Sequence, residues 1–137
     1  MLRKLLVTLV ALGTTVGLMV PTATSASALG GEWLGCQVIP GQGYYSNGCW
    51  GGSSSNPVIV DFVVMDETAP STYSWAVPSV YLTKISDGCQ STTNYCQLTV
   101  GRGGKEITMS VTLSQNGATE TLTSTASIEP MCGTQWC

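Results

Sequence analysis

The chain has no histidine. Without an imidazole, neither a Ser-His-Asp or Cys-His hydrolase nor a zinc site built on histidine can form in its usual way. The C-x-x-C spacing that thiol redox enzymes typically use is absent as well. We therefore predict a protein that is not an enzyme, with no catalytic residue, no metal site and no cofactor.

Charged side chains are also scarce, at 9% of the residues, and eight of them are acidic. Glycoside hydrolases use a pair of carboxylates, and the candidates by elimination are Asp61, Asp66, Glu67 and Asp87. Nothing in their spacing singles out a pair, so solvated strand edges and turns are the preferred interpretation. Asp66 and Glu67 lie beside a turn, but no D-x-D-x-D-G loop supports a calcium site there.

The N-terminal segment has the pattern of a secretory signal peptide. A short positive region precedes an uncharged, mostly apolar run over residues 5–20, and residues 26–28 read Ala-Ser-Ala, an A-x-A cleavage pattern. We predict a signal peptide over residues 1–28, cleaved after Ala28, and a secreted domain over residues 29–137. A retained membrane anchor is the alternative, but the apolar run is short for a membrane span.

Cleavage would leave an acidic domain. Three basic residues, Lys84, Arg102 and Lys105, would remain beside eight acidic ones, for a net charge of −5. Such a domain repels phosphate backbones and anionic lipids, so we expect no nucleic-acid partner, and no membrane partner after cleavage. The length of the domain suits a monomer with a single core.

All six cysteines lie after the predicted cleavage site: Cys36, Cys49, Cys89, Cys96, Cys132 and Cys137. An even number of cysteines in an exported chain predicts that all of them form disulfides. The firmest pair is Cys89–Cys96, because the segment between them is short, polar and free of proline. We favour a local scheme in which Cys36–Cys49 and Cys132–Cys137 are the other two pairs. The alternative joins the two N-terminal cysteines to the two C-terminal ones, which requires the first and last strands to lie side by side.

Apolar and polar residues alternate in short segments through the rest of the chain. In residues 106–114 every second residue is apolar, and Asn116 and Gly117 follow as a hairpin turn signal. No segment after the signal peptide shows a convincing helical period. The pattern predicts an all-β antiparallel β-sandwich of about seven strands. The expected strands cover residues 32–40, 57–66, 72–78, 80–85, 95–100, 106–114 and 118–128.

Aromatic residues gather around one loop. Residues 41–56 are rich in glycine, serine and asparagine, and four aromatic residues flank or occupy this loop: Trp33, Tyr44, Tyr45 and Trp50. Exposed rings beside amides and hydroxyls are typical of non-catalytic modules that bind sugar rings, so these four are the candidate ligand-binding residues. The alternative is that the rings cap the open end of the sandwich. Tyr73 and Trp75 lie on the apolar side of a strand pattern and are expected in the core.

The segments TYSWAV (residues 72–77) and EITMSVTLSQNGATETLTSTASI (residues 106–128) resemble the immunoglobulin-like group that includes polycystic-kidney-disease repeats. Tyr73 and Trp75 match the Y-x-W strand that supplies the core tryptophan in that group. Closing-strand core positions are matched by Val111, Leu113 and Leu122.

The resemblance covers about residues 57–128. The chain departs from it in its three predicted disulfides, and in having Val-Pro-Ser where a glycine-aspartate turn normally stands. Together with the signal peptide, the chain resembles small, secreted, cysteine-rich immunoglobulin-like proteins of actinobacteria. That resemblance implies an immunoglobulin-like β-sandwich in the extracellular space and no catalytic residues.

These expectations combine into a secreted, non-catalytic binding or interaction module of the extracellular space or cell envelope, with a protein or a glycan as ligand. One alternative is a small secreted proteinaceous inhibitor of an exoenzyme, and another is a structural surface-coat protein. A loop fixed at both ends would favour the inhibitor, whereas the glycine content of residues 41–56 predicts a flexible loop.

Overall fold

The computed structural model describes residues 29–54, 57–79, 84–101, 103–133 and 135–137. The predicted signal peptide, residues 1–28, lies outside the described residues. Every regular element in the described part of the chain is a β-strand, so that part contains no helix and none that could cross a membrane. The prediction of an all-β fold is confirmed.

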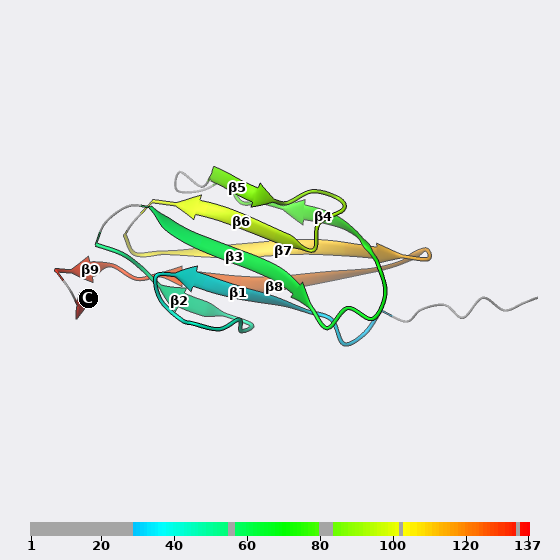
Figure 1. Cartoon of the computed structure of the whole chain (residues 1–137), viewed down its shortest axis with the longest axis horizontal. Helices are drawn as coiled ribbons and strands as arrows, with labels where there is room; N and C mark the ends of the chain where they lie inside the picture. Colours follow the sequence, from blue (N-terminus) through cyan, green and yellow to red (C-terminus); the bar gives the residue numbers. More distant parts are fainter. Residues whose placement is uncertain (1–28, 55–56, 80–83, 102, 134) are drawn as a thin grey trace, which may run out of the picture.

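Two four-stranded sheets lie face to face and form a β-sandwich (Figure 1). The first, here called the β3 sheet, is antiparallel and has the strand order β1 (Trp33–Ile39), β3 (Val58–Met65), β6 (Tyr95–Val100) and β5 (Lys84–Gly88). The second, the β7 sheet, has the order β2 (Cys49–Gly51), β8 (Ala118–Ile128), β7 (Lys105–Gln115) and β4 (Thr72–Ala76). Its strands are antiparallel except for β2, which runs parallel to β8. A short pair follows at the C-terminal end, β9 (Met131–Cys132) and β10 (Gln135–Trp136).

The core lies between the two sheets and follows from the alternation of side chains along each strand. β3 turns every second residue outward and buries the others, Val58, Val60, Phe62 and Val64. β7 does the same from the opposite sheet and buries Ile107, Met109, Val111 and Leu113. Burying a large apolar side chain in this way stabilises the fold by about 1.5–3 kcal/mol. The alternation that predicted the strands therefore also predicted which face of each sheet is buried.

β7 and β8 form a long hairpin whose register is unbroken over all eleven residues of each strand. The two residues that join them, Asn116 and Gly117, have φ angles of 49° and 83°. Both angles lie in the left-handed region that a two-residue hairpin turn of type I′ requires. The hairpin predicted from the Asn-Gly pair is confirmed.

All three predicted disulfides are present, in the local scheme: Cys36–Cys49, Cys89–Cys96 and Cys132–Cys137. The alternative that joins the N-terminal cysteines to the C-terminal ones is therefore wrong. Cys36–Cys49 is local in sequence but connects the two sheets, since Cys36 lies on β1 and Cys49 on β2. Both cysteines are buried, so this bond closes one long edge of the sandwich.

Three short strands are not predicted by the alternation of residues in the sequence. β2, β9 and β10 contain only two or three residues each, too few to show an alternating pattern. The strand expected over residues 80–85 is observed as Lys84–Gly88, and residues 80–83 lie outside the described residues.

Tyr73 and Trp75 both face the core side of β4, but only Tyr73 is buried. Tyr73 exposes 8% of its surface, whereas Trp75 is half-buried and packs against the margin of the core. β4 is the last strand of its sheet, and the indole N–H of Trp75 donates to the carbonyl oxygen of Thr93 at 3.1 Å. Trp75 is therefore a marginal rather than a central core residue, and Phe62 is the largest fully buried side chain.

Candidate binding edge

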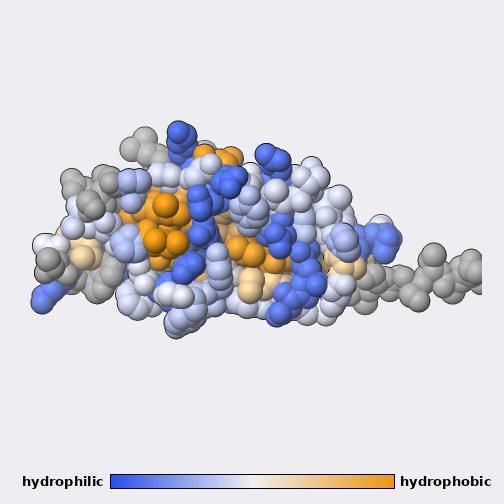
Figure 2. All heavy atoms as spheres, in the orientation of Figure 1, coloured by the Kyte–Doolittle hydropathy of each residue, from blue (hydrophilic) through white to orange (hydrophobic). Residues whose placement is uncertain are grey.

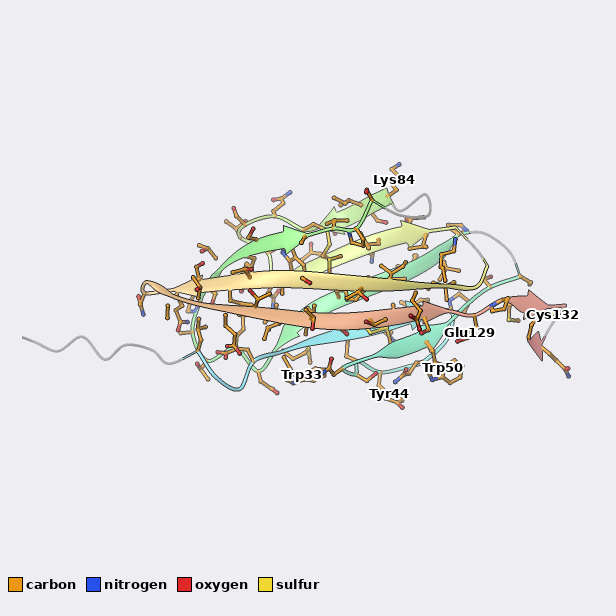
Figure 3. The ribbon with its side chains drawn as sticks, turned by 180° about the vertical axis from the view of Figure 1, so that it is seen from behind. Trp33, Tyr44, Trp50, Lys84, Glu129 and Cys132 are labelled. Carbon is orange, nitrogen blue, oxygen red and sulfur yellow. A yellow bond between two sulfur atoms is a disulfide. The ribbon has the colours of Figure 1, made fainter. Side chains whose placement is uncertain are left out.

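The four candidate aromatic residues lie along the long edge of the sandwich where β1 and β2, the last strands of the two sheets, are cross-linked. Figure 3 shows Trp33, Tyr44 and Trp50 along this edge. Tyr44 exposes 66% of its surface and Trp50 exposes 50%, while Trp33 and Tyr45 are half-buried. None of the four belongs to the buried core cluster. We call these four residues the aromatic edge.

The loop that follows β1 is fixed along its length. The backbone N–H of Cys36 donates to the carbonyl oxygen of Ser46 at 2.8 Å, and the N–H of Ser46 donates to the carbonyl oxygen of Cys36 at 3.2 Å. Further along, the N–H of Gln42 donates to the carbonyl oxygen of Trp50 at 3.3 Å. The disulfide between β1 and β2 then closes the loop covalently. The prediction of a flexible loop is therefore wrong for residues 41–51.

Glycine allows the two segments of this edge to approach each other closely. A Cβ atom on Gly51 would lie 2.6 Å from the carbonyl oxygen of Pro40 and 2.7 Å from Cγ1 of Val38. Distances this short are not tolerated, so only a residue without a side chain fits at this position. The glycine residues from which flexibility was predicted instead allow the segments of this edge to pack closely.

The polar side chains of the loop are also ordered. Nε2 of Gln37 donates to the carbonyl oxygen of Gln42 at 3.1 Å, and Nε2 of Gln42 donates to Oγ of Ser46 at 2.9 Å. Oγ of Ser46 in turn donates to the carbonyl oxygen of Gly48 at 2.6 Å. Groups that are ordered before a ligand arrives lose less conformational entropy on binding.

Two members of the aromatic edge meet over Gly35, on the outer face of β1. A Cβ atom on Gly35 would lie 3.1 Å from Cζ3 of Trp33, 3.2 Å from Cβ of Tyr45 and 3.2 Å from Cγ of Met65. The three side chains therefore converge over the backbone of Gly35. The indole N–H of Trp33 donates to Oδ2 of Asp66 at 2.7 Å, which fixes the orientation of the ring.

A carboxylate lies within electrostatic reach of Tyr45. Burial of the Tyr45 phenol, and then the negative charge of Asp61, raise the pKa of this phenol above its usual value. The direction follows because both effects disfavour the phenolate. Tyr45 is therefore a hydrogen-bond donor at neutral pH, beside an acceptor carboxylate.

Asp61 belongs to a row of polar side chains that crosses the outer face of the β3 sheet. Asp61 of β3 pairs with Gln37 of β1 on one side and with Gln97 of β6 on the other. We call Gln37, Asp61 and Gln97 the polar row. All three are partly exposed.

Apolar side chains occupy the outer face on both sides of the polar row. Ile39 and Ile59 pair on one side of it, and Val63 and Met65 follow Asp61 along β3 on the other. Figure 2 shows this arrangement as a blue band between two orange areas on the face of the β3 sheet. The sheet face is therefore divided into two apolar areas and has no single continuous one.

Three of the four carboxylates that are candidates for a glycosidase pair accept a hydrogen bond from an aromatic side chain. Asp66 accepts the Trp33 indole N–H, Glu67 accepts the hydroxyl of Tyr73 at 2.6 Å, and Asp87 accepts the hydroxyl of Tyr95 at 3.1 Å. Asp61 stands in the polar row. Each of these carboxylates therefore has a role in a hydrogen bond or in the polar row, and their contacts single out no catalytic pair.

Metal-ligating side chains do not gather anywhere in the described residues, where no group of three or more Asp, Glu or Cys side chains could hold an ion. An open hollow of about 480 Å³ lies at the end of the sandwich where β8 ends, lined by Ser53, Ser54, Gly103, Pro130, Met131 and Gly133. The described residues that line it include no charged or aromatic side chain, so the aromatic edge and the polar row remain the candidate site.

No protein-family model, curated protein or solved structure matches the chain. Function must therefore be inferred from the arrangement of its side chains.

The aromatic residues of the edge were expected from the sequence, whereas the polar row was not. The alternation of residues along β3 is enough to place Asp61 on the outer face, but nothing in the sequence pairs it with Gln37 and Gln97. That pairing depends on the register between β1, β3 and β6, which joins residues far apart in the chain. A polar residue in the outward register of three strands is the signal that could have found it.

Proposed function

We propose that this protein is a secreted, non-catalytic binding module of the extracellular space or cell envelope, with a protein or a glycan as its ligand. The observation that carries the proposal is the aromatic edge, where four large side chains lie outside the core on segments held by a disulfide and by hydrogen bonds. Rigid aromatic side chains offer large apolar contact areas and lose little conformational entropy when they bind.

Secretion is part of the proposal. Three disulfides suit an oxidising compartment, and a signal peptide over residues 1–28, cleaved after Ala28, would deliver the domain there. Membership in the small secreted immunoglobulin-like proteins of actinobacteria belongs to the same proposal, and the two-sheet architecture supports it.

A proteinaceous inhibitor of an exoenzyme is the second candidate. The observation in its favour is the fixed path of residues 41–51, which are bonded to β1 and cross-linked to β2. Inhibitors that present a rigid loop use this kind of constraint, because the loop then loses little entropy in the complex. Tyr44, the most exposed aromatic residue of the edge, lies near the middle of that loop.

The proposal is tested by retention on immobilised ligands. The disulfide-bonded protein would be passed over columns of cell-envelope proteins and of neutral and acidic polysaccharides, beside a Trp50→Ala variant. Thr123→Ala is the matched control, because Thr123 is an exposed β8 residue on the outer face of the β7 sheet. We expect at least one column to retain the wild type and the control and to release Trp50→Ala earlier.

Two results would count against a binding role at this edge. Equal elution of all three proteins from every column would place any binding elsewhere or exclude it. Inhibition of a secreted protease or glycosidase by the wild type, without retention on any column, would favour the second candidate instead.

A further inference from the structure

We propose that the outer face of the β3 sheet beside the aromatic edge is a subsite for an uncharged sugar ring of a polysaccharide. Trp33 and Tyr45 form the stacking side of this subsite, and Gln37 and Asp61 of the polar row form its hydrogen-bonding side. This inference rests on the proposed binding function and narrows its ligand from a protein or a glycan to a neutral glycan.

The two sides of the subsite are neighbours in the sheet. Trp33, Tyr45 and Met65 converge over Gly35. Two residues further along β1, on the same face, Gln37 pairs with Asp61. Residues i and i+2 of a strand are about 6.8 Å apart, a separation that one sugar ring can span. A sugar ring that rests on the side chains covering Gly35 can therefore reach the polar row with its hydroxyls.

The chemistry of each side suits a sugar. The one polar group of the Trp33 ring is already bonded to Asp66, so the ring offers an apolar surface to the C–H groups of a pyranose. Asp61 can accept hydrogen bonds from two sugar hydroxyls, and such charge-assisted bonds are stronger than neutral ones. The Tyr45 hydroxyl and the Gln37 amide add a donor and an acceptor beside it.

The charges around the subsite select against an anionic glycan. Asp61 lies within the subsite and Asp66 adjoins it through Trp33. Lys84 is the cation that the described residues place on this sheet, and it lies on β5, at the edge opposite β1. A carboxylated or sulfated sugar would therefore meet negative charge, and none of the described residues beside the subsite supplies a compensating cation.

A protein partner fits this face less well. The apolar area is interrupted by the polar row, whereas the centre of a protein interface is depleted of charged residues. A hydroxyl-rich polymer can satisfy the polar row and still place its C–H faces on the apolar areas. Mixed polar and apolar contact over a short distance is the pattern that a carbohydrate offers.

The test compares polymers that share a backbone and differ in charge. Hydroxyethylcellulose and carboxymethylcellulose form one such pair, and neutral xylan, galactomannan and dextran extend the panel. Affinity electrophoresis of the disulfide-bonded protein gives an association constant for each polymer. We expect the protein to be retarded by at least one neutral polymer, and a carboxylated form of that polymer to bind at least tenfold more weakly.

Variants then locate the subsite. Tyr45→Ala and Asp61→Ala should each lower the association constant for that neutral polymer at least tenfold, while Thr123→Ala on the opposite sheet leaves it unchanged. Asp61→Asn should reduce the difference between the association constants for the neutral and the carboxylated polymer, because it removes the negative charge that repels the carboxylates. Thermal unfolding of each variant shows whether it is folded, and Gln37→Ala serves as a milder second probe of the polar row.

The outcomes separate this inference from the proposed function. If no neutral polymer binds but an envelope protein does, or if carboxymethylcellulose binds more tightly than hydroxyethylcellulose, the neutral subsite is refuted and a binding module remains. If a neutral polymer binds and only Trp50→Ala weakens it, the subsite is misplaced. If neither polymers nor proteins bind, the proposed function itself fails.

Discussion

Removal of the Cys36–Cys49 disulfide should destabilise the sandwich strongly, because this bond joins the two sheets at the edge that carries the candidate site. The perturbation is the double substitution Cys36→Ala and Cys49→Ala. The two cysteines are 13 residues apart, and closing a loop of this size stabilises a fold by about 3 kcal/mol through the entropy of the unfolded chain. Both side chains are buried, so loss of the sulfur atoms also leaves a small cavity between the sheets. We expect a total loss of about 3–4 kcal/mol from a stability that is typically 5–15 kcal/mol.

The assay is equilibrium unfolding in urea, followed by circular dichroism and tryptophan fluorescence. The double variant should unfold at a lower urea concentration, with a slope that is equal or slightly larger because its unfolded chain is less compact. The control is the matched removal of Cys132–Cys137, which links exposed residues only 5 positions apart at the C-terminal end. The same loop-closure entropy gives about 2 kcal/mol for this shorter loop, and its cysteines are exposed, so the control should cost about 1–2 kcal/mol less than the Cys36–Cys49 variant. Equal losses of stability in the two variants, or a smaller loss in the Cys36–Cys49 variant than in the control, would show that this disulfide has no special role in holding the sheets together.

Three further predictions concern single features of the fold. Burial and a hydrogen bond to Glu67 raise the pKa of Tyr73. The folded state therefore keeps the phenolic proton of Tyr73 to a higher pH than the unfolded state does. The stability due to this proton is complete below about pH 10 and is lost as the pH rises further. Urea unfolding at a series of alkaline pH values should show the decline, and Tyr73→Phe should reduce its slope. Gly51→Ala should cost at least about 2 kcal/mol because its Cβ would meet the Pro40 carbonyl oxygen, whereas Gly43→Ala, with nothing within 4 Å, should leave the thermal midpoint nearly unchanged. The intact mass should not change on alkylation without a reductant, since the structure bonds all six cysteines, and any added label would reveal a free thiol.

The core could be predicted from the sequence because strand alternation is a local property. The buried face of a strand can be recognised within a few residues, as it can in Val58 to Val64 and in Ile107 to Leu113. The hairpin turn is likewise predicted by two adjacent residues, Asn116 and Gly117. Long-range pairing could not be predicted in this way. The parallel contact of β2 with β8 involves only three residues of β2, and the marginal position of Trp75 depends on β4 being the last strand of its sheet.

In the candidate site, too, local features could be predicted from the sequence and long-range contacts could not. The aromatic residues could be recognised because they cluster in sequence around a glycine-rich loop. The outward position of Asp61 follows from the alternation of residues along β3. That Trp33 and Tyr45 meet over Gly35 could not be predicted, because Tyr45 reaches this place only when its loop folds back along β1. The fixed loop was also missed, since glycine indicates flexibility in a sequence but permits close packing in a structure.

We propose that ligands bind at the aromatic edge and not elsewhere on the sandwich. NMR signals of the tryptophan indole N–H groups test it most directly, because Trp33 and Trp50 lie on the edge while Trp75 lies on β4. Fragments of whichever neutral polysaccharide retards the protein would be titrated into it. We predict that the Trp33 and Trp50 signals shift in proportion to saturation and that the Trp75 signal stays in place. A shift of the Trp75 signal alone, or saturation of the protein with no change in the Trp33 and Trp50 signals, would contradict binding at the aromatic edge.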